Sequence, residues 1–141
     1  MILNCSFEEL RALASGAELI RSPQAHGVDS PVAAPSETLA HVDLLRPRLS
    51  APFSIETLAE QRSVRTAVSA ICEELHERLE EKVIEYHPAH EEAVALYFDY
   101  AHAFAVLRRV EEMGVEMEAM IELMTGQPAT AATATSVTFP D

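Results

Sequence analysis

Two short motifs in the second half of the chain combine residue types that bind metal ions. Glu73 lies three residues before His76, and Asp99 lies three residues before His102. Residues three apart share one side of a helix, so each motif presents a carboxylate and an imidazole together. Such groups on facing helices are the ligands of di-iron and di-manganese bundles. The spacing therefore makes Glu73, His76, Asp99 and His102 candidate metal ligands, with iron or zinc as an alternative cofactor.

These motifs resemble the ferritin-like pattern, and the resemblance covers these four residues only. A tight turn expected between two long helices would make the two motifs near neighbours. The helical wheel, however, places Glu73 about 140° from the apolar stripe of its helix, and Asp99 away from the apolar residues of its own helix. Both carboxylates then lie on the outer face of a monomer. The two pairs would meet only in a dimer, where the outer face becomes an inner one.

Residues with nucleophilic chemistry form no recognisable catalytic motif. Cys5 and Cys72 are far apart in the sequence, and neither has a sequence-local base that would activate its thiol. Cys72 lies on the apolar stripe of its helix, so we expect a buried and inert thiol. The sequence contains no glycine-rich phosphate loop, no Gly-x-Ser-x-Gly and no His-Glu-x-x-His. We therefore expect a protein that is not an enzyme and has no cofactor.

The charge of the chain limits its partners. With 23 acidic and 10 basic residues among 141, the formal net charge is −13. Such a chain is repelled by phosphate backbones and by anionic membrane surfaces, so we expect no direct binding to nucleic acid or membranes. The N-terminus lacks the basic region of a signal peptide, and no apolar run is long enough to span a bilayer. The sequence predicts a cytoplasmic protein, for which a basic protein is a suitable partner.

Composition and periodicity predict an all-α fold. Glycine is scarce, with 4 residues, and alanine, leucine and glutamate are abundant. Strand-like alternation is nearly absent, so no significant sheet is expected. We predict one helical domain over residues 1–125, with short helices and proline-rich linkers in 1–53 and a helical hairpin in 54–125. Residues 126–141 are predicted to form a disordered tail.

Local signals indicate where the helices begin. Ser6 and Glu9 have the spacing of a capping box, which starts a helix that runs to about Arg21. Gly16 weakens this helix by up to about 1 kcal/mol relative to alanine. Serines at the N-cap position then predict a short second helix from Ser36 and a long third helix from Ser54.

The two arms of the predicted hairpin are residues 54–87 and 88–125, each roughly 50 Å long at 1.5 Å per residue. The second arm carries two apolar faces. The first face is expected to pack on the other arm and consists of Val94, Tyr97, Phe98, Ala101, Phe104 and Ala105. The second face, nearly opposite, is the candidate interaction surface and consists of Val106, Val110, Met113, Met117, Met120 and Met124.

The second face has the three- and four-residue steps of a coiled-coil seam. The methionines in it are flexible side chains that suit an adaptable surface, although they also fill cores. Two arms of this length are too long for the short N-terminal helices to cover. Either those helices or another copy of the chain must therefore cover the second face, and we expect a homodimer that forms a helical bundle.

These observations favour one function and leave two alternatives. The favoured function is a non-enzymatic protein-protein interaction module, such as an adaptor, an assembly factor or an inhibitor, that dimerises through its last long helix. The first alternative is a metal-binding, ferritin-like helical bundle that uses the two acid–histidine pairs. The second is an acidic decoy that occupies the nucleic-acid-binding site of another protein, which the charge permits.

Overall fold

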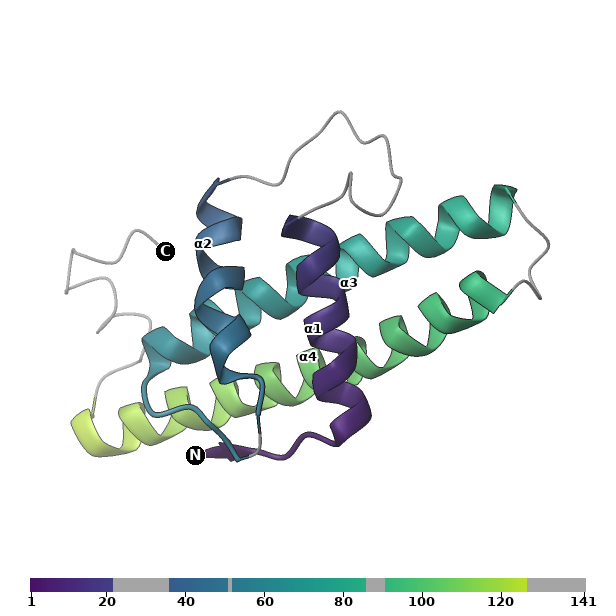
Figure 1. Ribbon diagram of the computed structural model, residues 1–141. Coiled ribbons are helices and arrows are strands. Elements are labelled where there is room, and N and C mark those ends of the chain that lie inside the picture. Colours follow the sequence, from purple (N-terminus) through teal and green to yellow (C-terminus); the bar gives the residue numbers. More distant parts are fainter. Residues whose placement is uncertain (22–35, 51, 86–90, 127–141) are drawn as a thin grey trace.

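Four helices make up most of the structure, a computed structural model that describes residues 1–21, 36–50, 52–85 and 91–126 (Figure 1). The predicted all-α class is confirmed. The helices are α1 (Phe7–Arg21), α2 (Ser36–Leu45), α3 (Leu58–Glu85) and α4 (Glu91–Thr125). Within the described ranges, none of the helices combines the length and apolar character that crossing a bilayer requires.

The two long helices α3 and α4 lie side by side and run in opposite directions (Figure 1). At one end of the pair, Gln61 Nε2 donates a hydrogen bond to the Val110 carbonyl oxygen at 2.9 Å. At the other end, Lys82 Nζ forms an ion pair with Glu92 at 2.8 Å. Residue numbers thus fall along α4 as they rise along α3. The turn that the sequence predicts between residues 87 and 88 lies outside the described residues.

The start of α1 follows the predicted capping box. The Ser6 N–H donates to Glu9 Oε1 at 2.8 Å, and the Glu9 N–H donates to Ser6 Oγ at 3.1 Å. Two N–H groups at the start of the helix are thereby satisfied. The Glu9 carboxylate also pairs with Arg109 of α4, whose Nη1 lies 3.0 Å from Glu9 Oε1, and Arg109 donates to the Asn4 carbonyl oxygen as well. One carboxylate therefore caps α1 and attaches it to α4.

The start of α3 differs from the prediction by about one turn. The predicted cap, Ser54, belongs to the short strand β2 (Phe53–Ser54), which pairs antiparallel with β1 (Ile2–Leu3). The cap of α3 is instead Thr57, whose Oγ1 accepts a hydrogen bond from the Glu60 N–H at 3.1 Å. The predicted start is wrong because the N-terminal segment pairs with Ser54 and holds it in a strand.

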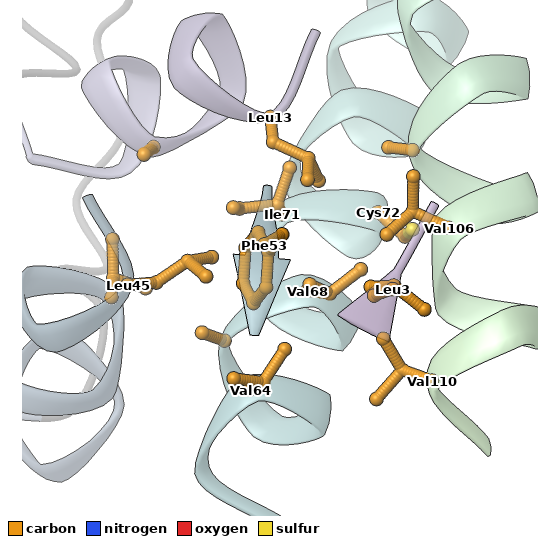
Figure 2. Packing of buried hydrophobic residues seen from close by; sticks show 14 of the residues in the cluster. Leu3, Leu13, Leu45, Phe53, Val64, Val68, Ile71, Cys72, Val106 and Val110 are labelled. Carbon is orange, nitrogen blue, oxygen red and sulfur yellow. The ribbon is translucent and has the colours of Figure 1, made fainter. Parts of the chain in front are cut away.

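The hydrophobic core lies where α1 and α2 pack on the long helix pair. The α1 helix contacts both α3 and α4, whereas α2 packs mainly on α3 through Val42 and Leu45. The two short strands add Leu3 and Phe53 to the edge of the same core. Figure 2 shows side chains of all these elements pointing toward one another, among them Leu3, Leu13, Leu45, Phe53, Val68, Ile71, Val106 and Val110.

Two glycines allow the helices to approach closely. A Cβ atom on Gly16 of α1 would lie 2.3 Å from Ile71 Cγ2 of α3. A Cβ atom on Gly114 of α4 would lie 2.5 Å from Gln61 Nε2 of α3. The Gly16 contact is with a branched side chain in the core, so a larger residue there would force a shift, whereas at Gly114 the flexible end of Gln61 would have to move and give up its hydrogen bond to Val110. From the sequence alone Gly16 is only a weak point of its helix, and its packing role becomes visible in the structure.

The short helices α1 and α2 cover only part of the length of the α3–α4 pair (Figure 1). Toward residues 85 and 91, α3 and α4 extend past α1 and α2 (Figure 1). The start of α4 therefore lies beside α3 and beyond α1, whereas farther along the helix Asp99 is close enough to Arg11 of α1 for their charges to interact. Within this extension a side chain of α4 is buried only where it faces α3, as Ala93 does.

Candidate functional site

The second apolar face of α4 lies mostly inside the core of one chain. Val106 and Val110 are fully buried, and Met113 and Met117 are nearly so. They belong to the cluster that includes α1 and α3, so helices of the same chain cover them. Dimerisation through this face stays a prediction, and the structure places these four side chains in the core of one chain. Of the six predicted residues, only Met120 and Met124 are exposed.

The first apolar face, which was expected to pack on α3, is exposed instead. Tyr97 is 55% exposed and Phe98 56%, while Val94 and Phe104 are 40% and 43% exposed. Ala101 is exposed and Ala105 half-buried. That prediction was wrong because a different line of side chains faces α3. These residues are Ala93, Leu96, Tyr100, Ala103, Leu107, Val110 and Gly114.

We call Val94, Tyr97, Phe98, Ala101 and Phe104 the aromatic stripe. It extends for ~15 Å along the outer face of α4. The Tyr97 and Phe98 rings meet edge to face with centroids 5.8 Å apart, and the Phe104 ring lies 5.9 Å from that of Tyr100. From residue 93 to 107 the only acidic or basic residue besides His102 is Asp99, which lies off the stripe, toward α1. An exposed, uncharged aromatic patch is typical of a protein interaction site.

A groove of about 360 Å³ runs beside the aromatic stripe, between α3 and α4. Tyr100, Phe104 and Leu107 of α4 form its apolar wall. The other wall comes from α3, with the exposed carboxylates of Glu73 and Glu77 at its rim. The remaining lining residues are Ser69, Cys72 and His76. The groove and the aromatic stripe share Phe104 and thus form one continuous surface.

The two acid–histidine pairs lie on different sides of the helix pair. Glu73 and His76 line the groove, where the His76 ring is tilted against the Tyr100 ring with centroids 5.4 Å apart and His76 Nδ1 lies 3.3 Å from Glu80. Asp99 lies on the α1 side. Burial raises its pKa, although Arg11 of α1 and His102 act in the opposite direction. In the described parts of the chain, no three His, Cys, Asp or Glu side chains are grouped to hold a metal ion. The predicted pairs are therefore not brought together within one chain.

The two thiols are held in their neutral form. Burial raises the pKa of Cys72 to about 12, with further contributions from the charges of Glu73 and Glu111. Burial and Glu9 also raise the pKa of Cys5, although Arg109 acts in the opposite direction. Since the thiolate is the reactive species, neither cysteine is prepared for nucleophilic chemistry. Cys72 is buried, as the sequence predicted.

Comparisons of the chain with protein-family models, with curated proteins and with solved structures found no match. The features that remain for assigning a function are the aromatic stripe, the groove and the negative charge. The stripe was visible in the sequence as an apolar face, but it was assigned to the interior. The groove was not predicted, because it depends on how α3 and α4 pack.

Proposed function

We propose that the protein is a non-enzymatic interaction module, an adaptor, assembly factor or inhibitor, that forms a homodimer through the aromatic stripe of α4. The observation that carries this proposal is the exposure of Tyr97, Phe98 and Phe104 on one uncharged line. Burying apolar surface gains a free energy of roughly 25 cal/mol for each Å², and side chains left in water do not contribute it. Tyrosine and phenylalanine are enriched at the centres of protein interfaces, and a second chain packed on the stripe would bury them.

The size of the stripe fits the centre of an interface rather than the whole of it. A specific interface of standard size buries about 800 Å² on each partner. Each aromatic side chain offers roughly 150–250 Å², and the three in the stripe are about half exposed. Two long helices packed along each other would add polar residues on both sides as a rim. Contact between long helices is a common way to reach the required area.

The charges at the two ends of the stripe favour an antiparallel arrangement of two α4 helices. Exposed Glu91 precedes the stripe, and exposed Arg108 follows it. A two-fold axis through the middle of the stripe, near residue 99, places Arg108 of one protomer beside Glu91 of its partner. A symmetric dimer makes this contact twice. A parallel arrangement would instead bring like charges together, which costs free energy.

Sedimentation equilibrium at micromolar concentration tests the dimer. The wild-type chain should have about twice its monomer mass of 15.5 kDa. Phe98→Glu should weaken the dimer roughly 100-fold, because an ion would be buried without a partner, while the circular dichroism spectrum stays unchanged.

Val115→Glu is the matched control. Val115 is 68% exposed on the same helix but lies outside the aromatic stripe, so this variant should remain a dimer. A wild-type monomer over the whole concentration range would refute the proposed dimer. Equal dissociation of both variants would refute the aromatic stripe as its location.

A further inference from the structure

The groove beside the stripe lies on the side of the helix pair that α1 does not cover. Arg109, which binds Glu9 of α1, lies about 140° around α4 from Phe104, which lines the groove. All lining residues of the groove come from α3 and α4. One side of the pair thus has a third layer from the same chain, whereas the groove on the other side is left uncovered by the described residues and can take a helix from elsewhere.

The two walls of the groove have different chemistry. Tyr100, Phe104 and Leu107 offer apolar and aromatic surface. Opposite them, Glu73 and Glu77 are exposed, and the lining residues that the structure describes include no lysine or arginine. The electrostatic potential at the floor of the groove, where Cys72 lies, is negative as well. Besides burial, the negative charges of Glu73 and Glu111 raise the pKa of Cys72. A ligand that fits this groove is apolar on one side and cationic on the other.

We propose that the groove binds a basic amphipathic helix of a partner protein. Apolar side chains of that helix pack on Tyr100 and Phe104, and its arginines or lysines pair with Glu73 and Glu77. This inference rests on the proposed interaction function and names the class of partner. An amphipathic helix lying in an apolar groove is a recurrent mode of recognition.

The spacing of the two carboxylates supports a helical partner. Glu73 and Glu77 are one helical turn apart, about 6 Å along the axis of α3. Basic residues four apart on a partner helix have the same spacing, so both charges can be met when that helix lies along the groove. An arginine can in addition stack on an aromatic ring, and Tyr100 and Phe104 present rings at the opposite wall.

A second copy of this chain suits the groove less well than a basic partner. The chain carries 23 acidic against 10 basic residues, so a second copy would bring mostly like charge to Glu73 and Glu77. Nucleic acid is repelled for the same reason. The dimer contact on the stripe and the helix in the groove therefore recognise different chemistry, although Phe104 borders both surfaces.

A synthetic peptide tests the proposal by fluorescence anisotropy. The probe is a labelled helical 16-residue peptide with leucines at three- and four-residue steps and two arginines four residues apart beside them. We expect saturable binding to the full chain at physiological salt. Replacing Glu73 and Glu77 together by glutamine should weaken binding roughly tenfold or more, because two charge contacts are lost. Phe104→Ala should weaken it as well, through the lost apolar wall.

The matched control is the double replacement of Glu112 and Glu116 by glutamine. These two glutamates are also exposed and four residues apart, but they lie on the outer face of the second half of α4. Removing them changes the net charge equally and should alter peptide binding less than twofold. Equal weakening by both double variants, or no binding to the wild-type chain, would overturn the groove as a specific site.

Sedimentation of the same variants keeps this proposal separate from the dimer. The Glu73→Gln/Glu77→Gln variant should remain a dimer, since both residues lie off the aromatic stripe. A wild-type monomer that binds the peptide would refute the dimer and retain the groove. A dimer that does not bind the peptide would refute the groove alone.

Discussion

The two halves of α4 carry comparable apolar side chains in opposite environments. Tyr97 and Phe98 in the first half are more than half exposed, whereas Val110 and Met113 in the second half are buried. The difference lies in the cover, because α1 approaches α4 at Asp99 and at Arg109, whereas the start of α4 extends beyond α1 and the aromatic stripe lies on the side that α1 does not reach (Figure 1). Burial in this chain therefore depends on which part of a helix has a neighbour, as well as on the side chains themselves.

The outer faces of the two halves differ in the same way. The outer face of the second half mixes charged residues with single exposed apolar ones such as Val115 and Leu123, as is usual for a helix side in water. Its exposed charged residues include Arg108, Glu111, Glu112, Glu116 and Glu122. In the first half the exposed charged residues are Glu91 and Glu92 at its start, and the aromatic stripe that follows them carries no charge. This contrast within one helix is what distinguishes an interaction surface from ordinary exposed apolar residues.

The largest expected effect tests the buried half. Met117→Glu should lower the free energy of unfolding by about 3 kcal/mol, because the carboxylate would be buried without a partner. Met124→Glu is the control, since Met124 is exposed one heptad further along the same helix and the change should have little effect. Urea denaturation of both variants measures the difference. Equal stability of the two would show that α4 is not covered at Met117.

The next effect concerns the close approach of α1, which provides the cover. Gly16→Ala places a methyl group against Ile71, and overpacking of this kind costs about 1–3 kcal/mol. The higher helix propensity of alanine offsets up to about 1 kcal/mol of that cost. Ser15→Ala, at an exposed neighbouring position, supplies a similar change in propensity without the contact. A Gly16→Ala variant that is more stable than wild type in urea would contradict this packing.

A smaller effect depends on pH and tests how α1 is attached to α4. Burial alone would raise the pKa of Glu9, but Arg109 and the hydrogen bonds from Ser6 lower it below its ordinary value of 4.5. The ionised carboxylate therefore stabilises the fold above pH 4.5, and this stability is lost as the pH falls through the lowered pKa.

Glu9→Gln should accordingly reduce stability by about 1–2 kcal/mol at pH 7. The difference from wild type should shrink below pH 4.5. Glu8→Gln, at the exposed neighbouring position, is the control for the loss of one charge near the start of α1. Thermal melts of the wild type and both variants from pH 7 to below pH 4.5 would show this pH dependence. A stability difference that does not vary with pH would exclude the ion pair as its cause.

The smallest effect is expected in the uncovered half. In a Phe98→Glu background, which is designed to keep the chain monomeric, Val94→Ser should change the free energy of unfolding by less than about 0.5 kcal/mol. Val110→Ser in the same background should cost roughly 2 kcal/mol or more, since Val110 is fully buried. The same substitution is thus compared in the two halves of one helix. Similar costs in urea would remove the distinction between them.

Much of the fold could be predicted from local sequence signals. The capping box at Ser6 and Glu9 fixed the start of α1, and Ser36 marked the start of α2. Both signals act over three or four residues and are insensitive to the rest of the chain. Ser54 gave the wrong start for α3, because its pairing partner is Ile2, 52 positions earlier in the sequence.

The assignment of the two faces of α4 failed for a different reason. The line that faces α3 was present in the sequence as unbroken steps of three and four residues from Ala93 to Gly114. Three of its members are Ala93, Ala103 and Gly114, which look weak on a hydrophobicity scale but permit close helix contact. The aromatic residues of the stripe are larger and score higher in hydrophobicity, so the stripe was taken for the buried face. The buried face is recognised when the periodic spacing of small residues is given the same weight as that of large apolar residues.

The groove could not be predicted from one helix at a time. It requires Glu73 and Glu77 of α3 to lie beside Tyr100 and Phe104 of α4, and this depends on the register of the pair. The contact between Glu9 and Arg109 is hidden for a related reason, because 100 residues separate the partners. Glu9 also has a sufficient local role in the capping box, so nothing in its neighbourhood indicates a second one.

The double role of Glu9 has a consequence for the order of folding. Its bond to the Ser6 N–H spans three residues and can form while the rest of the chain is still unfolded. Its contact with Arg109 spans 100 residues and requires α4 to have docked. The same carboxylate thus takes part in an early and a late event. Weakening only the late contact should leave refolding about as fast as before and shorten the lifetime of the folded state.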